Sequence, residues 1–295
     1  MTDAWPALPY DAWRATCSTL HMWTQIVGKV RLALAPPVNH WWQVPFYVGA
    51  RGLMTTAIPY GDSSFEMEFD FIDHVLAIRT CDGDTRIVKL EPKSVAAFYA
   101  EVMAALTSLG LTVHIWTMPQ EVDAPIPFDK DTTHAAYERE PVERFWRVLR
   151  SVDAVLKEFR SGYIGKVSPV HFFWGSFDLC VTRFSGRRAP PMPKADKVTQ
   201  EAYSHEVSSV GWWPGDPTTA YPAFYAYASP EPNGFGDARV LPASAFYDKD
   251  AGQFRLKYDD VRSATSPRQT LLDFCRTTYE ATATLAAWNR GELER

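Results

Sequence analysis

The chain has 295 residues, eleven of them tryptophan, and a formal net charge of −5. A chain of this length buries roughly three quarters of its unfolded surface, so we expect a large core without disulfide or metal staples. The negative charge disfavours nonspecific nucleic-acid binding, which requires basic patches. No apolar run of about 18 residues and no leader-like N-terminus occur, so we expect a cytoplasmic protein without membrane association. The four cysteines form no CxxC pair, which disfavours a cysteine-based zinc site.

In the range 1–117, the pattern of apolar and turn residues predicts a helix, a series of antiparallel strands and a second helix. Apolar residues recur with helical spacing over 11–26, and Gly28 is predicted to end that helix. A second helix is predicted to begin at Ser94 and to end at Gly110. Strands are predicted at 41–51, 53–59, 65–71, 75–80, 86–90 and 111–116.

The range 118–137 is rich in Pro and Asp and lacks periodicity, so it is predicted to be a linker. The range 138–295 then predicts the same order of elements, with a Pro-rich insertion at 187–198 that we expect to be a mobile loop. Its helices are predicted at 142–159 and 267–288, and its strands at 168–187, 201–213, 223–227, 244–247 and 253–258.

Two short signals relate the halves. Gly-Lys-Val occurs at 28–30 and at 165–167, and each copy precedes a His-aromatic-aromatic stretch that begins at His40 or His171. We therefore predict an α+β fold of two tandem pseudo-repeats, each helix–antiparallel β-meander–helix, packed together. The alternative is that two α+β halves share this order by chance.

His40 and His171 each begin a predicted strand whose same-side neighbours are apolar. If the two rings lie close together, they can supply neutral imidazole ligands to a metal ion, or an acid–base pair. The alternative is that each ring hydrogen-bonds to the backbone and orders the preceding loop.

The stretch EAYSHEVSS is the most polar of the predicted strands, and Glu201, Tyr203 and His205 would share one of its faces. Such a face is costly unless its groups are paired or exposed. We expect either a metal-ligand pair of Glu201 and His205, or a general base His205 that Glu201 orients. An edge strand facing water is the alternative.

Other carboxylates are weaker candidates. Asp178 and Trp174 lie opposite the His171 face of the predicted strand. A carboxylate among aromatic rings can bind a cationic or hydroxylated ligand, and the alternative is that Asp178 pairs with Arg183 or with Lys166. Glu231 lies in a Pro/Gly loop of the kind that often closes over a site.

The stretch FEMEFDFIDH places Glu66, Glu68 and Asp70 on one face of a predicted strand. Three such carboxylates resemble a Ca²⁺ or Mg²⁺ surface, but the alternation is more typical of a half-buried strand with a solvated face.

Several long stretches resemble a bacterial family known only as a domain of unknown function. They are WPALPYDAW, TLHMWTQIVGKVRLALAPPVNHWW, FEMEFDFIDH, SPVHFFWGSFDLCVTRFSGR, EAYSHEVSS and FYAYASPEP. The resemblance covers nearly the whole chain and implies a soluble bacterial protein made of this one unit. It implies no activity, cofactor or catalytic residue.

Two functional hypotheses follow. The first is an enzyme of unknown reaction acting on a small molecule in an aromatic-lined cleft between the halves, with a bound divalent metal ion as an option. Its expected catalytic residues are His171, His205, Glu201 and Tyr203, its ligand-binding residues Trp41, Trp174, Asp178, Arg183 and Glu231, and its metal ligands His40, His171 and His205.

The second hypothesis is a non-catalytic module that binds an apolar or aromatic ligand, or a partner protein. It would use Trp41, Trp174, Trp212 and Trp213. Convergence of the three histidines in space favours the enzyme, and dispersal favours the binding module. The sequence decides neither the substrate nor the oligomeric state.

Overall fold

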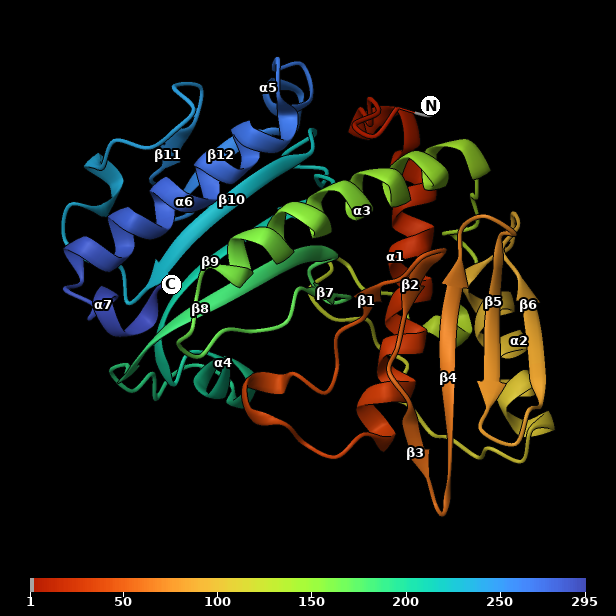
Figure 1. The fold of residues 1–295 in the computed structure, drawn as a ribbon. Helices are drawn as coiled ribbons and strands as arrows, with labels where there is room; N and C mark the ends of the chain where they lie inside the picture. Colours follow the sequence, from red (N-terminus) through yellow and green to blue (C-terminus); the bar gives the residue numbers. More distant parts are fainter. Residues whose placement is uncertain (1–2) are drawn as a thin grey trace.

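Two six-stranded antiparallel sheets and the helices packed on them make up the computed structural model, which describes residues 3–295 (Figure 1). This is the predicted α+β class. The first half contains α1 (Tyr10–Leu34), η1 (Asn39–Trp41), β1 (Tyr47–Val48), β2 (Gly52–Met54), β3 (Ile58–Tyr60), β4 (Ser63–Asp70), β5 (Val75–Thr80), β6 (Thr85–Lys89), α2 (Val95–Ser108) and η2 (Phe128–Lys130). The second half contains α3 (Arg139–Ser161), β7 (His171–Phe173), β8 (Asp178–Arg188), α4 (Lys197–Ala202), β9 (His205–Trp213), β10 (Ala223–Ser229), η3 (Phe235–Asp237), β11 (Phe246–Asp248), β12 (Gln253–Lys257), α5 (Tyr258–Arg262), α6 (Pro267–Leu285) and α7 (Arg290–Leu293).

The two sheets meet at one backbone bridge. The first sheet has the order β1-β2-β4-β5-β6, with β3 paired to β4, and the second has the order β11-β12-β10-β9-β8-β7. Phe46 and Phe172 exchange two backbone hydrogen bonds of 2.8 and 2.9 Å, which place β1 beside β7. Figure 1 shows α3 and α6 lying across one face of the second sheet, while α1 stands between the sheets. The buried apolar side chains of both halves form one cluster.

Helix α1 is longer than predicted, because Gly28 does not end it. A Cβ atom at this position would overlap the indole ring of Trp174, so the glycine allows a close approach between α1 and the second half. The Trp174 indole N–H donates to the Val44 carbonyl at 3.0 Å, which fixes the ring in this place. Trp174 is therefore a core residue.

The predicted strand over 168–187 is a hairpin. Strands β7 and β8 flank a turn at 174–177, in which Phe177 has a φ of 58°. The alternation of aromatic residues continues through this turn, so periodicity alone conceals it. The real side-chain directions therefore differ from the predicted ones after Phe173.

Two further strand predictions are wrong at their N-terminal ends. The range 39–41 forms η1, with positive φ at His40 and Trp41, and the strand that follows is only Tyr47–Val48. Residues 197–202 form α4, because the Asp196 carboxylate accepts hydrogen bonds from the first free N–H groups of the helix. At 111–116 the described chain has no strand.

The predicted linker at 118–137 is packed against α1. Lys29 donates to the Met118 carbonyl at 2.5 Å, and the Gln25 side chain bonds to both backbone groups of Gln120 at 2.8 Å. Phe128 is fully buried. The segment therefore has a fixed path, and the proposed division of the chain on either side of it stays a prediction.

The duplication also stays a prediction. Each half has the order helix, strands, helix. However, β12 lies between β10 and β11, whereas β4, β5 and β6 are consecutive neighbours, so the second sheet is not a simple meander. The two Gly-Lys-Val signals occupy different places, one inside α1 and the other beyond the end of α3.

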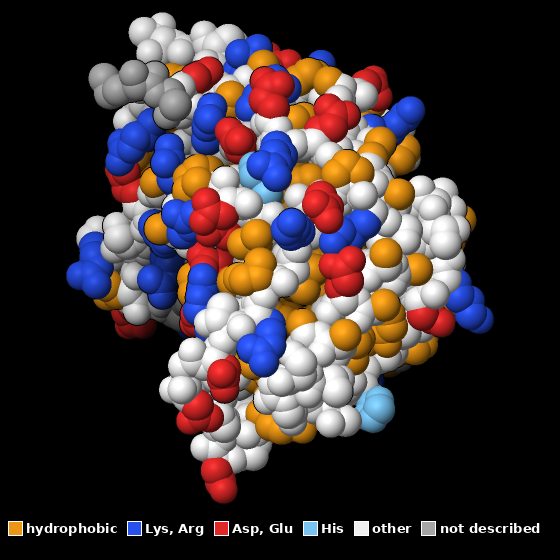
Figure 2. Space-filling model, turned by 90° about the vertical axis from the view of Figure 1, so that its right-hand side faces the viewer, with side chains coloured by type: hydrophobic (Ala, Val, Ile, Leu, Met, Phe, Trp, Pro, Cys, Tyr) orange, Lys and Arg blue, Asp and Glu red, His pale blue; other side chains and the backbone are white. Residues whose placement is uncertain are grey.

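The face that carries β5, β6 and α2 has acidic and basic side chains interspersed (Figure 2). Over the described residues, no helix combines the length and the apolar character needed to cross a membrane.

The contact between Gly28 and Trp174 gives a first prediction. In an ordinary helix interior, Gly→Ala stabilises by about 1 kcal/mol. We expect Gly28→Ala instead to lower the free energy of unfolding by about 1–3 kcal/mol, because the methyl group overpacks the indole. Urea unfolding of Gly28→Ala, Trp174→Phe and the double variant measures this. A Gly28→Ala protein as stable as the parent, or strictly additive effects, would contradict the contact.

Candidate functional site

A cavity of about 890 Å³ lies over the face of the second sheet that α3 and α6 leave open. Strands β8, β9 and β10 form its floor, and α1, η1, α4 and the 118–137 segment contribute its walls. Its size is within the range of small-molecule sites. The aromatic lining residues are Tyr10, Trp41, Trp42, Phe173, Phe177, Phe184, Tyr203, Trp213, Tyr225 and Tyr227.

The floor of the cavity contains a hydrogen bond between side chains two strands apart. Tyr225 on β10 donates to the Asp178 carboxylate on β8, with β9 between them. Gly211 is the β9 residue paired with Tyr225, and a Cβ atom there would overlap the phenol oxygen. The missing side chain of Gly211 therefore allows the phenol to cross β9 and reach Asp178.

Asp178 is a buried carboxyl group with one free oxygen. The residue is 6% exposed, and its Oδ1 atom has no hydrogen-bond partner in the described chain. Burial raises the pKa of Asp178 to about 6, against the hydrogen bond from Tyr225, which lowers it, while the charge of Glu121 raises it further. Near neutral pH this carboxyl group can therefore both accept and give up a proton.

The other polar groups of the floor are neutral. Tyr203 and Tyr227 hydrogen-bond through their hydroxyl oxygens at 2.9 Å. Burial holds the pKa values of Tyr225 and Tyr227 well above their usual range, so both phenols stay protonated. Burial likewise raises the pKa of the Cys180 thiol well above its usual value, which keeps it from acting as a thiolate nucleophile.

His40 ties η1 to α4. Its Nδ1 atom lies 3.1 and 3.2 Å from the carbonyl oxygens of Glu201 and Ala202, and its Nε2 atom lies 2.6 Å from Lys166 Nζ. Because an ammonium group only donates, Nε2 accepts and Nδ1–H donates to the carbonyls. Burial, with Lys166, lowers the pKa of His40, which favours this neutral form. The ring of His205 lies 5.7 Å from that of His40.

His171 lies apart from these two histidines and does not line the cavity. It is 1% exposed, its Nε2 atom lies 3.3 Å from the Tyr47 hydroxyl, and burial lowers its pKa to about 3. Trp42 packs against both His40 and His171, at 5.3 and 6.0 Å between ring centres. Within residues 3–295 no three His, Cys, Asp or Glu side chains are placed to hold a metal ion. The expected set of three histidine ligands is therefore not assembled.

Asp178, Tyr203 and Trp41 are the predicted site residues that line the cavity, together with the predicted ligand His40. Glu201 does not: it lies on α4 with an exposed side chain, so it does not share a strand face with His205 as predicted. The roles expected of His171 and His205 in catalysis stay predictions.

Three predicted ligand-binding residues lie elsewhere. Trp174 packs on α1, as described above. Arg183 points to the opposite face of the sheet, where its guanidinium lies 3.5 Å from the centre of the Phe159 ring and donates to the Phe159 carbonyl. Glu231 accepts a hydrogen bond of 2.6 Å from the Tyr247 hydroxyl and does not line the cavity.

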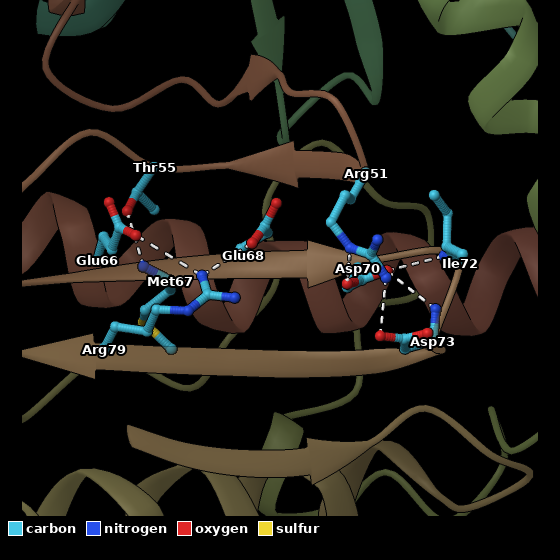
Figure 3. Close-up of polar contacts among 9 residues, drawn as sticks. All are labelled: Arg51, Thr55, Glu66, Met67, Glu68, Asp70, Ile72, Asp73 and Arg79. Carbon is cyan, nitrogen blue, oxygen red and sulfur yellow. Dashed lines mark hydrogen bonds and ion pairs between the residues drawn. The ribbon is translucent and has the colours of Figure 1, made fainter. Parts of the chain in front are cut away.

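The acidic face of β4 is paired with arginines (Figure 3). Arg79 lies 2.8 Å from Glu68 and 3.6 Å from Glu66, and Arg51 pairs with Asp70. These ion pairs on a half-buried strand agree with the solvated-face interpretation of FEMEFDFIDH.

Sequence reasoning missed several residues of the site. Tyr225 and Tyr227 alternate with alanines along β10, and Gly211 lies inside β9; a glycine within a strand often marks a place where another group approaches the backbone closely. His21 was also missed: its Nε2 atom lies 3.0 and 2.8 Å from the carbonyl oxygens of Trp174 and Gly175, and burial lowers its pKa to about 4.

The buried carboxyl group gives a second prediction. The pKa of Asp178 is about 6 in the folded protein against 3.8 ordinarily, so the folded state keeps a proton that the unfolded chain loses. The stability from this group is therefore complete below about pH 4 and is lost as the pH rises to about 6, by about 3 kcal/mol in all. We expect Asp178→Asn to remove this slope and to be more stable than the parent at pH 7.

Urea unfolding between pH 4 and pH 8 measures the effect. Asp62→Asn, in the exposed turn between β3 and β4, is the control and should keep the slope of the parent. A slope that survives unchanged in Asp178→Asn would show that Asp178 ionises normally.

Comparisons with known proteins give one match. No curated protein and no solved structure matches the chain. The sequence profile described as "Family of unknown function (DUF5996)" matches residues 5–295, which is nearly the whole chain. The protein therefore belongs to this family of unknown function.

Proposed function

We propose that the protein is an enzyme that acts on a small molecule in the cavity, with Asp178 as its general acid or base. The observation that carries the proposal is the state of this side chain: it is buried, its Oδ1 atom is unpartnered, and its pKa is near 6. General acid–base catalysis works best when the pKa lies close to the working pH. Carboxyl groups with such shifts concentrate at active sites.

The neighbouring residues support a proton-transfer role. Tyr225 donates a hydrogen bond to the Oδ2 atom of Asp178, which leaves the covered Oδ1 atom as the oxygen without a partner in the described chain. The paired hydroxyls of Tyr203 and Tyr227 stand on the same floor as neutral hydrogen-bonding groups. Nucleophilic catalysis by Cys180 is less well supported, because the thiol is held in its protonated form.

A non-catalytic binding protein is the second candidate. The observation in its favour is the lining itself, which is mainly aromatic and includes Trp41 and Trp213. A cavity of this composition can hold an organic molecule without changing it.

A screen of small metabolites tests the proposal. Quenching of tryptophan fluorescence detects binding, and NMR spectra of the mixture detect a compound that is consumed. We expect the parent to consume at least one compound and Asp178→Asn to do so at least about 100-fold more slowly, because general acid–base groups contribute 10²–10⁴-fold.

Asp153→Asn is the matched control, since Asp153 is also buried, lies on α3 outside the cavity and pairs with Lys157. It should leave the turnover unchanged. A ligand that quenches the parent but is recovered unaltered would favour the binding protein. Equal turnover by the parent and Asp178→Asn would overturn the role of Asp178.

A further inference from the structure

We infer that the cavity selects an organic cation, so that the substrate of the proposed enzyme carries an amine or quaternary ammonium group. This inference rests on the proposed function in taking the cavity as the active site. Of the lining residues that the structure describes, none is Lys or Arg. Four are carboxylates, namely Glu121, Asp123, Asp178 and Asp216.

The carboxylates are arranged by depth. Glu121, Asp123 and Asp216 are exposed, whereas Asp178 is 6% exposed on the floor. Exposed charges of one sign around a cleft raise the local concentration of the opposite ion and steer it inward. A ligand that follows this gradient reaches the floor of the cavity, where Asp178 is a lining residue whose covered Oδ1 atom has no hydrogen-bond partner in the described chain.

The imidazoles in the lining do not offset this charge. Burial lowers the pKa of His21 to about 4, and burial with Lys166 lowers that of His40, so both rings are neutral at pH 7. The third imidazole, His134, lies beside the carboxylate of Asp131, with 2.7 Å between Nδ1 and Oδ2, so any positive charge on it is offset there. The lining is therefore anionic at neutral pH.

The aromatic walls suit the same ligand. The face of an aromatic ring attracts a cation, most strongly when both are shielded from water. The chain already uses two lining rings in this way: the Lys166 ammonium lies 5.4 Å from the centre of Trp42 and 4.9 Å from that of Phe184. Lys166 itself does not line the cavity.

An anionic ligand fits these observations poorly. A phosphate or carboxylate would have to enter past three exposed carboxylates and lie beside a fourth, with no lining Lys or Arg among the described residues to pair with it. Like charges at short distance in a partly dry site are strongly unfavourable. A neutral ligand avoids the repulsion but leaves Asp178 without a partner of opposite charge.

Three probes of nearly equal shape test the inference: choline, its neutral isostere 3,3-dimethyl-1-butanol, and the anion 3,3-dimethylbutanoate. Their affinities for the full chain at pH 7.5 are measured by ligand-observed NMR and tryptophan quenching. We expect choline to bind with a dissociation constant on the order of 1 mM, at least about tenfold tighter than the alcohol, and the anion to bind most weakly.

Two variants locate the preference. Asp178→Asn should weaken choline binding about tenfold and leave the alcohol unchanged, because only the cation uses the charge. Glu121→Gln, at the exposed rim, should weaken choline by a few fold and reduce the salt dependence of binding. Asp153→Asn should match the parent for all three probes.

The inference is overturned if choline does not bind, or if the alcohol or the anion binds as tightly. Because the measurement is of binding and not of turnover, it separates the two proposals. A preference for choline in a protein that consumes no metabolite would retain the cation site and remove the enzyme. Turnover of a neutral or anionic compound would retain the enzyme and remove the cation site.

Discussion

The fold depends on the polar side chains buried along α1. Gln25 and Lys29 hydrogen-bond to the backbone of Gln120 and Met118, and His21 bonds to carbonyl groups of the β7–β8 turn. A buried polar group that loses its partner costs about 1–3 kcal/mol. Separating the 118–137 segment or the β7–β8 turn from α1 would therefore lower the stability of the fold. The part of the wall at 118–137 and the β7–β8 turn are therefore held by hydrogen bonds to one helix.

On the floor of the cavity, by contrast, a buried polar group lowers the stability of the fold. Asp178 is buried without a cation beside it, and its raised pKa means that the charged form is disfavoured in the folded state. Tyr225 offsets part of this cost, and it reaches Asp178 only because Gly211 has no side chain. Arrangements that give up stability in this way are typical of sites kept for function.

The sequence predicts the parts of the fold that local patterns control. Helices α2, α3 and α6 and strand β5 were predicted close to their observed bounds, because each helix has a sustained apolar period and β5 is a short continuous apolar run. The β7–β8 turn and η1 were missed because long-range contacts decide them, whereas α4 was missed because the local cap at Asp196 was not recognised. Strand β7 ends before Trp174, whose ring packs against Gly28 of α1. His40 in η1 hydrogen-bonds to the last residues of α4.

The same distinction holds for the site. Asp178, Tyr203 and Trp41 could be named from their unusual surroundings in the sequence. The partnership of Asp178 with Tyr225 could not, because it crosses β9 and depends on the register of three strands. Glu201 and His205 were predicted to share a face because residues two apart alternate in a strand. Glu201 instead lies in the capped helix α4, so the two side chains do not share a strand face.

The lining of the cavity comes from three distant parts of the chain, at 10–42, 121–134 and 173–253. An occupant that touches all three can bind only while they are assembled, so its binding free energy is added to the work of unfolding the complete chain. The abundance of that metabolite in the cell would then set how long the protein survives heat and proteases, independently of any chemistry performed on it.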